Sequence, residues 1–126
     1  MKKILLVDDQ YEIRRLMRQT LGKSFEVFEA EDGENGLHLA KKVLPDLIIL
    51  DIRMPGKMDG LQLLSAVRAN PQLHSTLVIL VSALQREVDV KRGGELGADA
   101  YFVKPFSPLQ LLACVQECFL KEAQHE

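Results

Sequence analysis

The chain has 126 residues, of which 47% are hydrophobic and 27% are charged. This is the size and balance of one folded globular domain rather than of a disordered chain. Its 16 basic and 18 acidic residues leave a net charge of −2, so the excess of basic residues typical of a nucleic-acid-binding surface is absent. No apolar run approaches the roughly 18 residues of a membrane span. The run Ile4–Val7 is too short for a signal-peptide core, so we expect a single cytoplasmic domain over residues 1–126.

The apolar residues predict five strands and five helices in strict alternation. Short apolar runs, one of them alternating with glutamates, predict strands over residues 3–7, 25–30, 47–50, 77–81 and 100–103. Apolar residues at helical spacing predict helices over residues 11–21, 34–44, 60–69, 86–96 and 108–121. Parallel strands joined by right-handed helical crossovers form one sheet with helices on both faces. We therefore expect a doubly wound α/β fold.

Capping residues support several of these helices. Asp32 precedes the second helix and Asp59 the third, and a short acidic side chain at this position accepts hydrogen bonds from the first free N–H groups. Gln62 lies three residues after Asp59 and predicts a reciprocal capping box. Ser107 followed by Pro108 is a typical helix start, with serine as the N-cap and proline at the first helical position.

Reactive side chains follow four of the predicted strands. Asp8 and Asp9 come after the first strand and Asp51 ends the third, while Ser82 and Lys104 follow the fourth and fifth. Ligands of such sheets bind beyond the carboxyl ends of the strands, so these side chains are expected to converge. The three acids and one lysine leave a local charge of −2. Two carboxylates about 4 Å apart repel by roughly 4 kcal/mol at an effective dielectric of about 20.

Such a cluster either takes up protons or binds a divalent cation. Oxygen-only ligands favour Mg²⁺, for which Mn²⁺ can substitute. Any one of these aspartates could instead cap a helix, as Asp9 could for the helix that follows it, but capping does not explain three acids beside a lysine. A carboxylate, a lysine and a hydroxyl at one edge favour phosphoryl transfer to Asp51. Lys104 and Ser82 would then each contact a phosphoryl oxygen, and the small side chain of Ala83 would leave room beside it.

Taken together and in order, the segments around these residues resemble the receiver domain of two-component response regulators, from Lys3 to about Lys121. The matching segments are Ile4–Asp9, Leu47–Pro55, Met58–Gly60, Val78–Ala83 and Gly97–Phe106. The resemblance implies the flavodoxin-like strand order 2-1-3-4-5, for which a member of this family is a standard example. It also implies a cis peptide bond before Pro105, which X–Pro bonds adopt at small cost.

The resemblance implies a role for each acidic residue. Asp51 would be the phosphoacceptor. Asp9, Asp51 and the main-chain carbonyl of Arg53 would ligate Mg²⁺, and Asp8 would act mainly through metal-bound water. A protein of this kind is a signalling switch that catalyses its own phosphorylation and dephosphorylation only, rather than an enzyme acting on other substrates.

The resemblance also implies a switch mechanism. Ser82 and Tyr101 would form the switch pair, and the backbone of Ala83 would bind the phosphoryl group, although Tyr101 alone would pass for an ordinary aromatic residue at a strand end. The residues two positions after Asp51 and Ser82 are Arg53 and Leu84, and their side chains would flank the phosphoryl group. Neither can act as a base on an attacking water, so we expect slow self-dephosphorylation.

Two protein partners are implied. A sensor histidine kinase or a histidine phosphotransfer protein would dock on the first helix, where Arg14, Arg15 and Arg18 are expected on the outer side. The signal would leave through the fourth helix, the fifth strand and the fifth helix, toward an output domain or a second copy of the chain. Gly93 and Gly94 should make the fourth helix marginal, since each costs roughly 1 kcal/mol relative to alanine. The fifth helix carries more apolar residues than one buried stripe needs.

Three other interpretations are open. An aspartate-nucleophile phosphatase of the dehalogenase type needs an acid two residues after its nucleophile, where this chain has Arg53. A flavodoxin needs a phosphate-binding loop after the first strand, where Asp8 and Asp9 would repel the phosphate. A degenerate receiver would act without phosphorylation. The sequence also departs from the family pattern, with an additional residue at Gly56-Lys57 and with Ser82 in place of the commoner threonine.

Overall fold

The computed structural model describes residues 1–83 and 87–124. Within them, five strands and five helices alternate along the chain. The strands are β1 (Lys3–Val7), β2 (Glu26–Ala30), β3 (Leu47–Asp51), β4 (Leu77–Ser82) and β5 (Ala100–Val103). The helices are α1 (Tyr11–Leu21), α2 (Gly33–Val43), α3 (Gly60–Ala69), α4 (Glu87–Glu95) and α5 (Pro108–Gln124). The predicted alternation is therefore confirmed, with boundaries that agree to within three residues in the described helices and strands.

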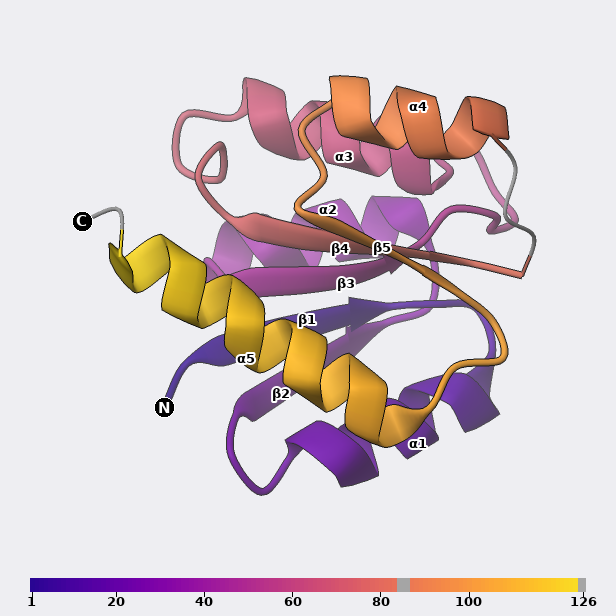
Figure 1. Cartoon of the computed structure of the whole chain (residues 1–126). Coiled ribbons are helices and arrows are strands. Elements are labelled where there is room, and N and C mark those ends of the chain that lie inside the picture. The colour runs from indigo at the N-terminus through magenta and orange to yellow at the C-terminus, as the bar shows by residue number, and fades with distance from the viewer. Residues whose placement is uncertain (84–86, 125–126) are drawn as a thin grey trace.

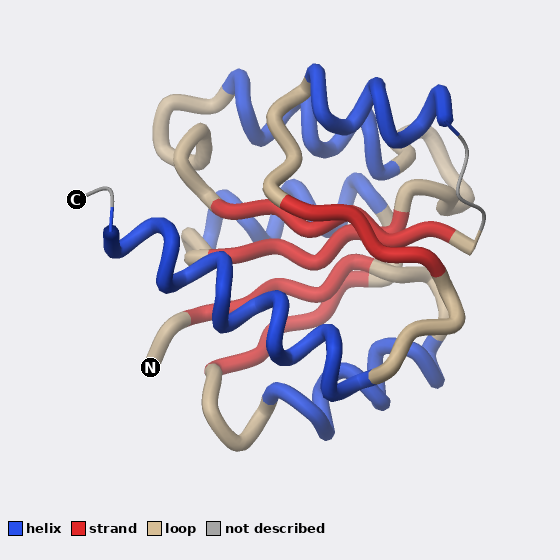
Figure 2. Tube along the Cα trace, viewed as in Figure 1, coloured by secondary structure: helices blue, strands red, loops and turns tan. Residues whose placement is uncertain are grey.

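The strands form one parallel sheet in the order β2-β1-β3-β4-β5. Figure 1 shows α1 and α5 on one face of this sheet and α2, α3 and α4 on the other. The tube in Figure 2 makes the three layers plain, with the strands between two groups of helices. The doubly wound fold and the strand order expected from the sequence are both confirmed. None of the helices in residues 1–83 and 87–124 has the length and apolar character needed to cross a membrane.

The inner strands β1 and β3 are buried on both faces. Leu5 and Ile48 point to the core beneath α2 and α3, whereas Ile4 and Ile49 point to the core beneath α1 and α5. Each of these four side chains is at most 1% exposed. This two-sided burial explains why both strands read as continuous apolar runs instead of alternating patterns. The parallel pairing of Val7 with Leu50 places the carboxyl ends of β1 and β3 side by side.

The predicted helix caps form. The carboxylate of Asp59 accepts a hydrogen bond of 2.9 Å from the Gln62 N–H, and the Gln62 side chain accepts one of 2.8 Å from the Asp59 N–H. Asp32 accepts a hydrogen bond of 2.8 Å from the Asn35 N–H at the start of α2. The cap at Asp59 sets where the chain leaves the loop after β3, close to the carboxyl edge of the sheet.

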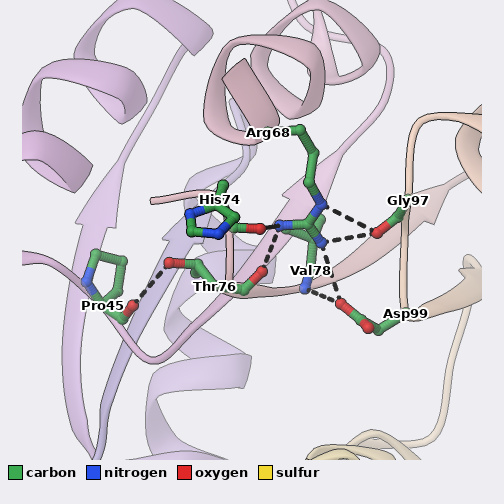
Figure 3. Close-up of polar contacts among 7 residues, drawn as sticks. All are labelled: Pro45, Arg68, His74, Thr76, Val78, Gly97 and Asp99. Carbon is green, nitrogen blue, oxygen red and sulfur yellow. Dashed lines mark hydrogen bonds and ion pairs between the residues drawn. The ribbon is translucent and has the colours of Figure 1, made fainter. Parts of the chain in front are cut away.

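At the amino end of the sheet, one arginine joins three segments (Figure 3). The guanidinium of Arg68, in α3, donates to the carbonyls of His74 at 3.1 Å, Thr76 at 2.6 Å and Gly97 at 2.7 Å. It also pairs with Asp99 Oδ2 at 3.2 Å. Gly97 has a φ of +91°, and a Cβ there would lie 3.0 Å from Arg68 Nε. The loop before β5 therefore requires glycine, and Arg68 fixes it to α3.

Glycine has a packing role in α4 that the sequence pattern does not show. A Cβ on Gly93 would lie 2.5 Å from Cδ1 of the buried Leu80, whereas one on Gly94 would meet nothing within 4 Å. Gly93 thus lets α4 approach β4 closely, and only Gly94 carries the cost in helix propensity without a packing reason. The expectation that both glycines weaken the helix leaves out this packing role of Gly93.

Candidate functional site

Three aspartates meet at the carboxyl end of the sheet. Asp8 and Asp9 follow β1, and Asp51 is the last residue of β3. Because Val7 is in register with Leu50, the residues that follow each of these two come together. One carboxylate oxygen from each of the three acids lies within 4.8 Å of the others. Asp8 and Asp51 are only 1% and 5% exposed, while Asp9 is open to solvent. The predicted acidic cluster is present.

Lys104 reaches this cluster from the loop after β5. Its Nζ lies 2.8 Å from Asp8 Oδ2 and 3.2 Å from Asp51 Oδ2, and it donates to Gln10 Oε1 at 2.9 Å. The three N–H donors of the ammonium group therefore each have an acceptor. The peptide bond between Lys104 and Pro105 is cis, as the resemblance implied.

The charges perturb both partners. Burial, followed by repulsion from Asp8, raises the pKa of Asp51 from 3.8 to about 6, although Lys104 opposes this shift. Burial lowers the pKa of Lys104, but its contacts with Asp8 and Asp51 outweigh burial, so that its pKa is raised overall. Lys104 is therefore a permanent cation, yet it does not neutralise the acids completely. A buried carboxyl that titrates near neutrality is a frequent mark of a functional site.

The cluster has the chemistry of a Mg²⁺ site. Its donors are all carboxylate oxygens, two of them buried and one exposed, and Mg²⁺ is usually held by one or two carboxylates while it keeps several waters. A divalent cation would also relieve the repulsion that raises the pKa of Asp51. The main-chain carbonyl of Arg53 remains a predicted further ligand. The Arg53 N–H faces Asp51 Oδ1 at 3.4 Å, so this residue borders the acceptor carboxylate.

The Arg53 side chain has a partner that the sequence pattern does not reveal. Its Nη2 lies 3.3 Å from Oδ2 of Asp89, in the first turn of α4. Asp89 is 7% exposed, whereas the Arg53 side chain is 60% exposed. The Arg53 side chain thus reaches toward α4, and its expected place beside a phosphoryl group remains a prediction. Leu84, given the same role by the sequence, lies outside the described residues.

Strand register places Ser82 beside the cluster, because Asp51 is opposite Val81, and places Tyr101 two residues before the end of β5. Ser82 ends β4 with 1% exposure and accepts a backbone hydrogen bond of 2.7 Å from Lys104. Ala83 follows it at the exposed edge. Tyr101 is half-buried in β5, in register with Leu80, and packs against the core beneath α2, α3 and α4. Their roles as phosphate ligands and switch residues remain predictions.

The arginines of α1 differ from expectation. Arg14 Nη1 donates to the Asp8 carbonyl at 2.6 Å, and Arg14 Nε pairs with Glu29 at 3.1 Å. The Arg14 side chain is only 12% exposed, so its placement on the outer side of the helix is wrong. Arg18 also pairs with Glu29, at 2.5 Å, but keeps a 49% exposed side chain. Arg15 is exposed as expected. Glu29 lies on β2. The alternation of apolar residues with glutamates along that strand was the one sequence signal for these pairs.

The five-stranded parallel sheet thus carries three aspartates and a largely buried lysine at the carboxyl end of its strands. The family model for the response regulator receiver domain matches residues 4–116. The chain therefore belongs to the receiver domains of two-component response regulators, as the sequence motifs indicated. Receiver domains are signalling switches, and the family generally binds Mg²⁺ at an acidic pocket.

Similar proteins include two bacterial transcriptional regulators. The chain is 40% identical over 116 residues to the alkaline phosphatase synthesis transcriptional regulatory protein PhoP of Bacillus subtilis, covering 91% of the chain and 47% of the relative. It is 43% identical over 117 residues to the transcriptional regulatory protein CpxR of Escherichia coli, covering 92% of the chain and 48% of the relative. The chain thus spans about half the length of these curated relatives.

Solved receiver structures agree with the fold. The chemotaxis protein CheY4 of Vibrio cholerae is 36% identical, with a TM-score of 0.87 over 93% of this chain and 98% of that one. A CheY-like receiver domain protein of Methanospirillum hungatei is 28% identical, with a TM-score of 0.93 over 100% of this chain and 99% of that one. These likenesses cover the whole sheet and both helical layers.

Proposed function

We propose that this chain is a phosphorylation-operated switch in which Asp51 accepts a phosphoryl group from a phosphohistidine in a Mg²⁺-dependent reaction. One observation carries the proposal. The buried Asp51 carboxylate lies beside two further acids, with oxygens within 4.8 Å, and is paired with Lys104 at 3.2 Å. An acceptor for phosphoryl transfer needs a nucleophilic oxygen next to groups that receive the negative charge of the incoming phosphate.

The transfer would proceed by in-line attack. An Asp51 carboxylate oxygen forms a bond to phosphorus while the bond between phosphorus and the donor imidazole nitrogen breaks, and that nitrogen keeps the electron pair and takes a proton. The product is an acyl phosphate on Asp51 and a free histidine. Bound Mg²⁺ supplies positive charge that offsets the acids and the transferring oxygens. Asp9, Asp51 and the Arg53 carbonyl would hold it, with Asp8 acting through metal-bound water.

The other residues of the site receive and report the phosphoryl group. Lys104 would exchange its contact with the Asp51 carboxylate for one with a phosphoryl oxygen. The Ser82 hydroxyl and the Ala83 N–H would bind other oxygens, and Tyr101 would follow Ser82 inward. Such a change shifts the population between two conformations rather than creating a new one. Slow self-dephosphorylation is still expected, because Arg53 has no basic atom at neutral pH.

The partners proposed are a sensor histidine kinase or a histidine phosphotransfer protein as donor, and an output domain or second copy at the face formed by α4, β5 and α5. The exposed apolar side chains of Val88, Leu109 and Leu120 support this output face, since they are 76%, 75% and 64% exposed. Phe119 does not belong to it, because its ring packs against Phe25 at 5.7 Å between centroids. The apolar excess of α5 is thus partly internal. We place residues 1–126 in the cytoplasm as one receiver domain, without direct contact to nucleic acid.

The test is labelling with acetyl phosphate followed by intact mass measurement. We expect one phosphate-sized mass increase in the presence of Mg²⁺ and none after chelation with EDTA. Asp9→Asn should strongly reduce the labelling obtained at a given Mg²⁺ concentration, because it removes a charged ligand of the ion. The matched control is Asp32→Asn, which changes the same side chain at the cap of α2 and should label normally. Equal labelling with and without Mg²⁺ would contradict the proposed site.

A further inference from the structure

We propose that Asp89 is a positioning residue for Arg53, and that Asp89 and the phosphoryl group on Asp51 compete for the same guanidinium. The inference rests on the proposed function, since it takes Asp51 as the phosphoacceptor. It adds a residue on α4 to the site and gives the charge change at Asp51 a direct route to that helix.

The contact joins two distant segments. Arg53 follows the acceptor carboxylate by two residues, and its N–H faces Asp51 Oδ1 at 3.4 Å. Its guanidinium Nη2 lies 3.3 Å from Asp89 Oδ2, 36 residues further along the chain. Both segments are within the described residues, although the connection 84–86 between β4 and α4 is not. One side chain therefore links the loop beside the acceptor to the first turn of α4.

The burial of the two partners is unequal. Asp89 is 7% exposed, whereas the Arg53 side chain is 60% exposed and free to turn in solvent. A buried carboxylate needs its counter-ion, because an unpaired buried charge is strongly destabilising. The exposed arginine, in contrast, loses little by changing partner. Among residues 1–83 and 87–124, Arg53 is the only cation paired with Asp89, so that Asp89 depends on this contact and Arg53 is the partner that can leave.

The balance of charge favours departure once Asp51 is phosphorylated. A phosphoryl group carries about −1.5 to −2 charges and three strong acceptor oxygens. Arginine binds phosphate through two parallel hydrogen bonds of roughly 2.7–2.9 Å. Its contact with Asp89 is a single one at 3.3 Å. Lys104, the cation that contacts the cluster, already serves Asp8, Asp51 and Gln10. Arg53 is the next cation along the chain from the acceptor.

The release of Arg53 has a consequence for α4. Asp89 would be left as a buried carboxylate without its counter-ion, and the first turn of α4 would have to move for that carboxylate to reach water. The other end of the helix is less free to move, because Arg68 holds the Gly97 carbonyl at 2.7 Å. Competition is reciprocal. The more strongly Asp89 holds Arg53, the less strongly Arg53 interacts with the phosphoryl group or its mimic at Asp51.

The test uses beryllofluoride, a mimic of the phosphoryl group, titrated in the presence of Mg²⁺. We expect Asp89→Asn to bind it about threefold tighter, which is the size expected for the loss of one partly exposed ion pair. The matched control is Glu87→Gln, which makes the same charge change in the same turn of α4 and should leave the affinity unchanged. Asp89→Glu restores the charge and should restore the original affinity.

A double-mutant cycle decides the mechanism. In the Arg53→Gln background, Asp89→Asn should no longer change the affinity for beryllofluoride. In the unmodified chain, beryllofluoride should reduce the amide exchange protection of residues 87–92. In Arg53→Gln it should leave that protection unchanged. A gain that persists without Arg53, or an equal gain in Glu87→Gln, would overturn the positioning role. Failure of the unmodified chain to bind beryllofluoride would instead overturn the phosphoacceptor assignment. The unfolding midpoint of each variant, measured without ligand, identifies any loss of fold.

Discussion

The two ends of the sheet use charge in opposite ways. At the amino end, the single cation of Arg68 meets three carbonyls and Asp99, so that charge and hydrogen-bonding capacity match. At the carboxyl end, three acids lie together while Lys104 pairs with Asp8 and Asp51, and burial together with repulsion from Asp8 raises the pKa of Asp51 to about 6. The same parallel sheet thus has one end where polar contacts stabilise the fold and another where repulsion is retained. A divalent cation bound between the acids would relieve repulsion of this kind.

The largest expected effect is a gain in stability from damaging the carboxyl end. The pKa of Asp51 is about 6 in the folded state against 3.8 ordinarily, so folding favours the protonated form. The ionised carboxylate therefore costs stability above pH 6, and this cost disappears below pH 3.8. At about 1.4 kcal/mol per pKa unit, Asp51→Asn should stabilise the metal-free protein by about 2 to 3 kcal/mol at pH 7.5.

Urea unfolding from pH 4 to pH 8 in EDTA measures this effect. The advantage of Asp51→Asn should shrink as the pH falls through 6, and saturating Mg²⁺ should reduce it at pH 7.5. Asp46→Asn is the control of equal charge at the amino end of β3, and it should lower stability because Asp46 accepts a hydrogen bond of 2.7 Å from the Lys3 N–H. An advantage independent of pH would contradict the electrostatic origin.

Damage to the amino end should have the opposite sign. Arg68→Ala removes the donors to three carbonyls, of which that of Thr76 is bound most closely, at 2.6 Å, in a partly buried position. We expect the free energy of unfolding to fall by about 2 kcal/mol, the value of one charge-assisted hydrogen bond. The other two carbonyls are more exposed and can form hydrogen bonds to water instead. Arg68→Lys should recover only part of it, since lysine lacks the planar fork.

Urea unfolding of both variants, together with acetyl phosphate labelling, separates the two ends. Labelling of the folded Arg68→Ala protein should match that of the unmodified chain. A labelling defect in a fully folded sample would show that the amino end is coupled to the acceptor.

The smallest effects come from the paired glycines of α4, which lies between the two ends. Gly94→Ala should stabilise the protein by up to about 1 kcal/mol, because a Cβ there meets nothing within 4 Å and alanine favours the helix. Gly93→Ala should destabilise it, because its Cβ would come within 2.5 Å of Leu80 Cδ1. Thermal unfolding of the two variants should shift the midpoint in opposite directions. Two shifts of the same sign would mean that α4 does not pack on β4 as described.

The carboxyl end could be predicted from the sequence to the extent that strand register dictates it. Asp8, Asp51 and Lys104 each directly follow or end a strand, so parallel pairing alone brings their backbones to one edge. The strand order came from the family resemblance, since alternation of strands and helices does not fix which strands are neighbours.

Long-range side-chain pairing could not be predicted in the same way. Arg53 and Asp89 are separated by 36 residues, and neither belongs to a pattern that depends on the other. Arg14 was expected in solvent because it lies among other arginines, but its inward pairing depends on the position of Glu29 on the neighbouring strand. Gly93 was read as a weakness of the helix because the approach of Leu80 is a tertiary contact.

The assignment of Asp51 as the phosphoacceptor is tested most directly by chemical mapping of the acyl phosphate. The chain is labelled with acetyl phosphate and Mg²⁺ and treated with borohydride, which reduces an aspartyl phosphate to homoserine. It is then digested and sequenced by mass spectrometry. We predict homoserine at position 51 in the labelled sample and none without acetyl phosphate. Homoserine at position 8 or 9 instead, or a phosphate label retained by Asp51→Asn, would contradict the assignment.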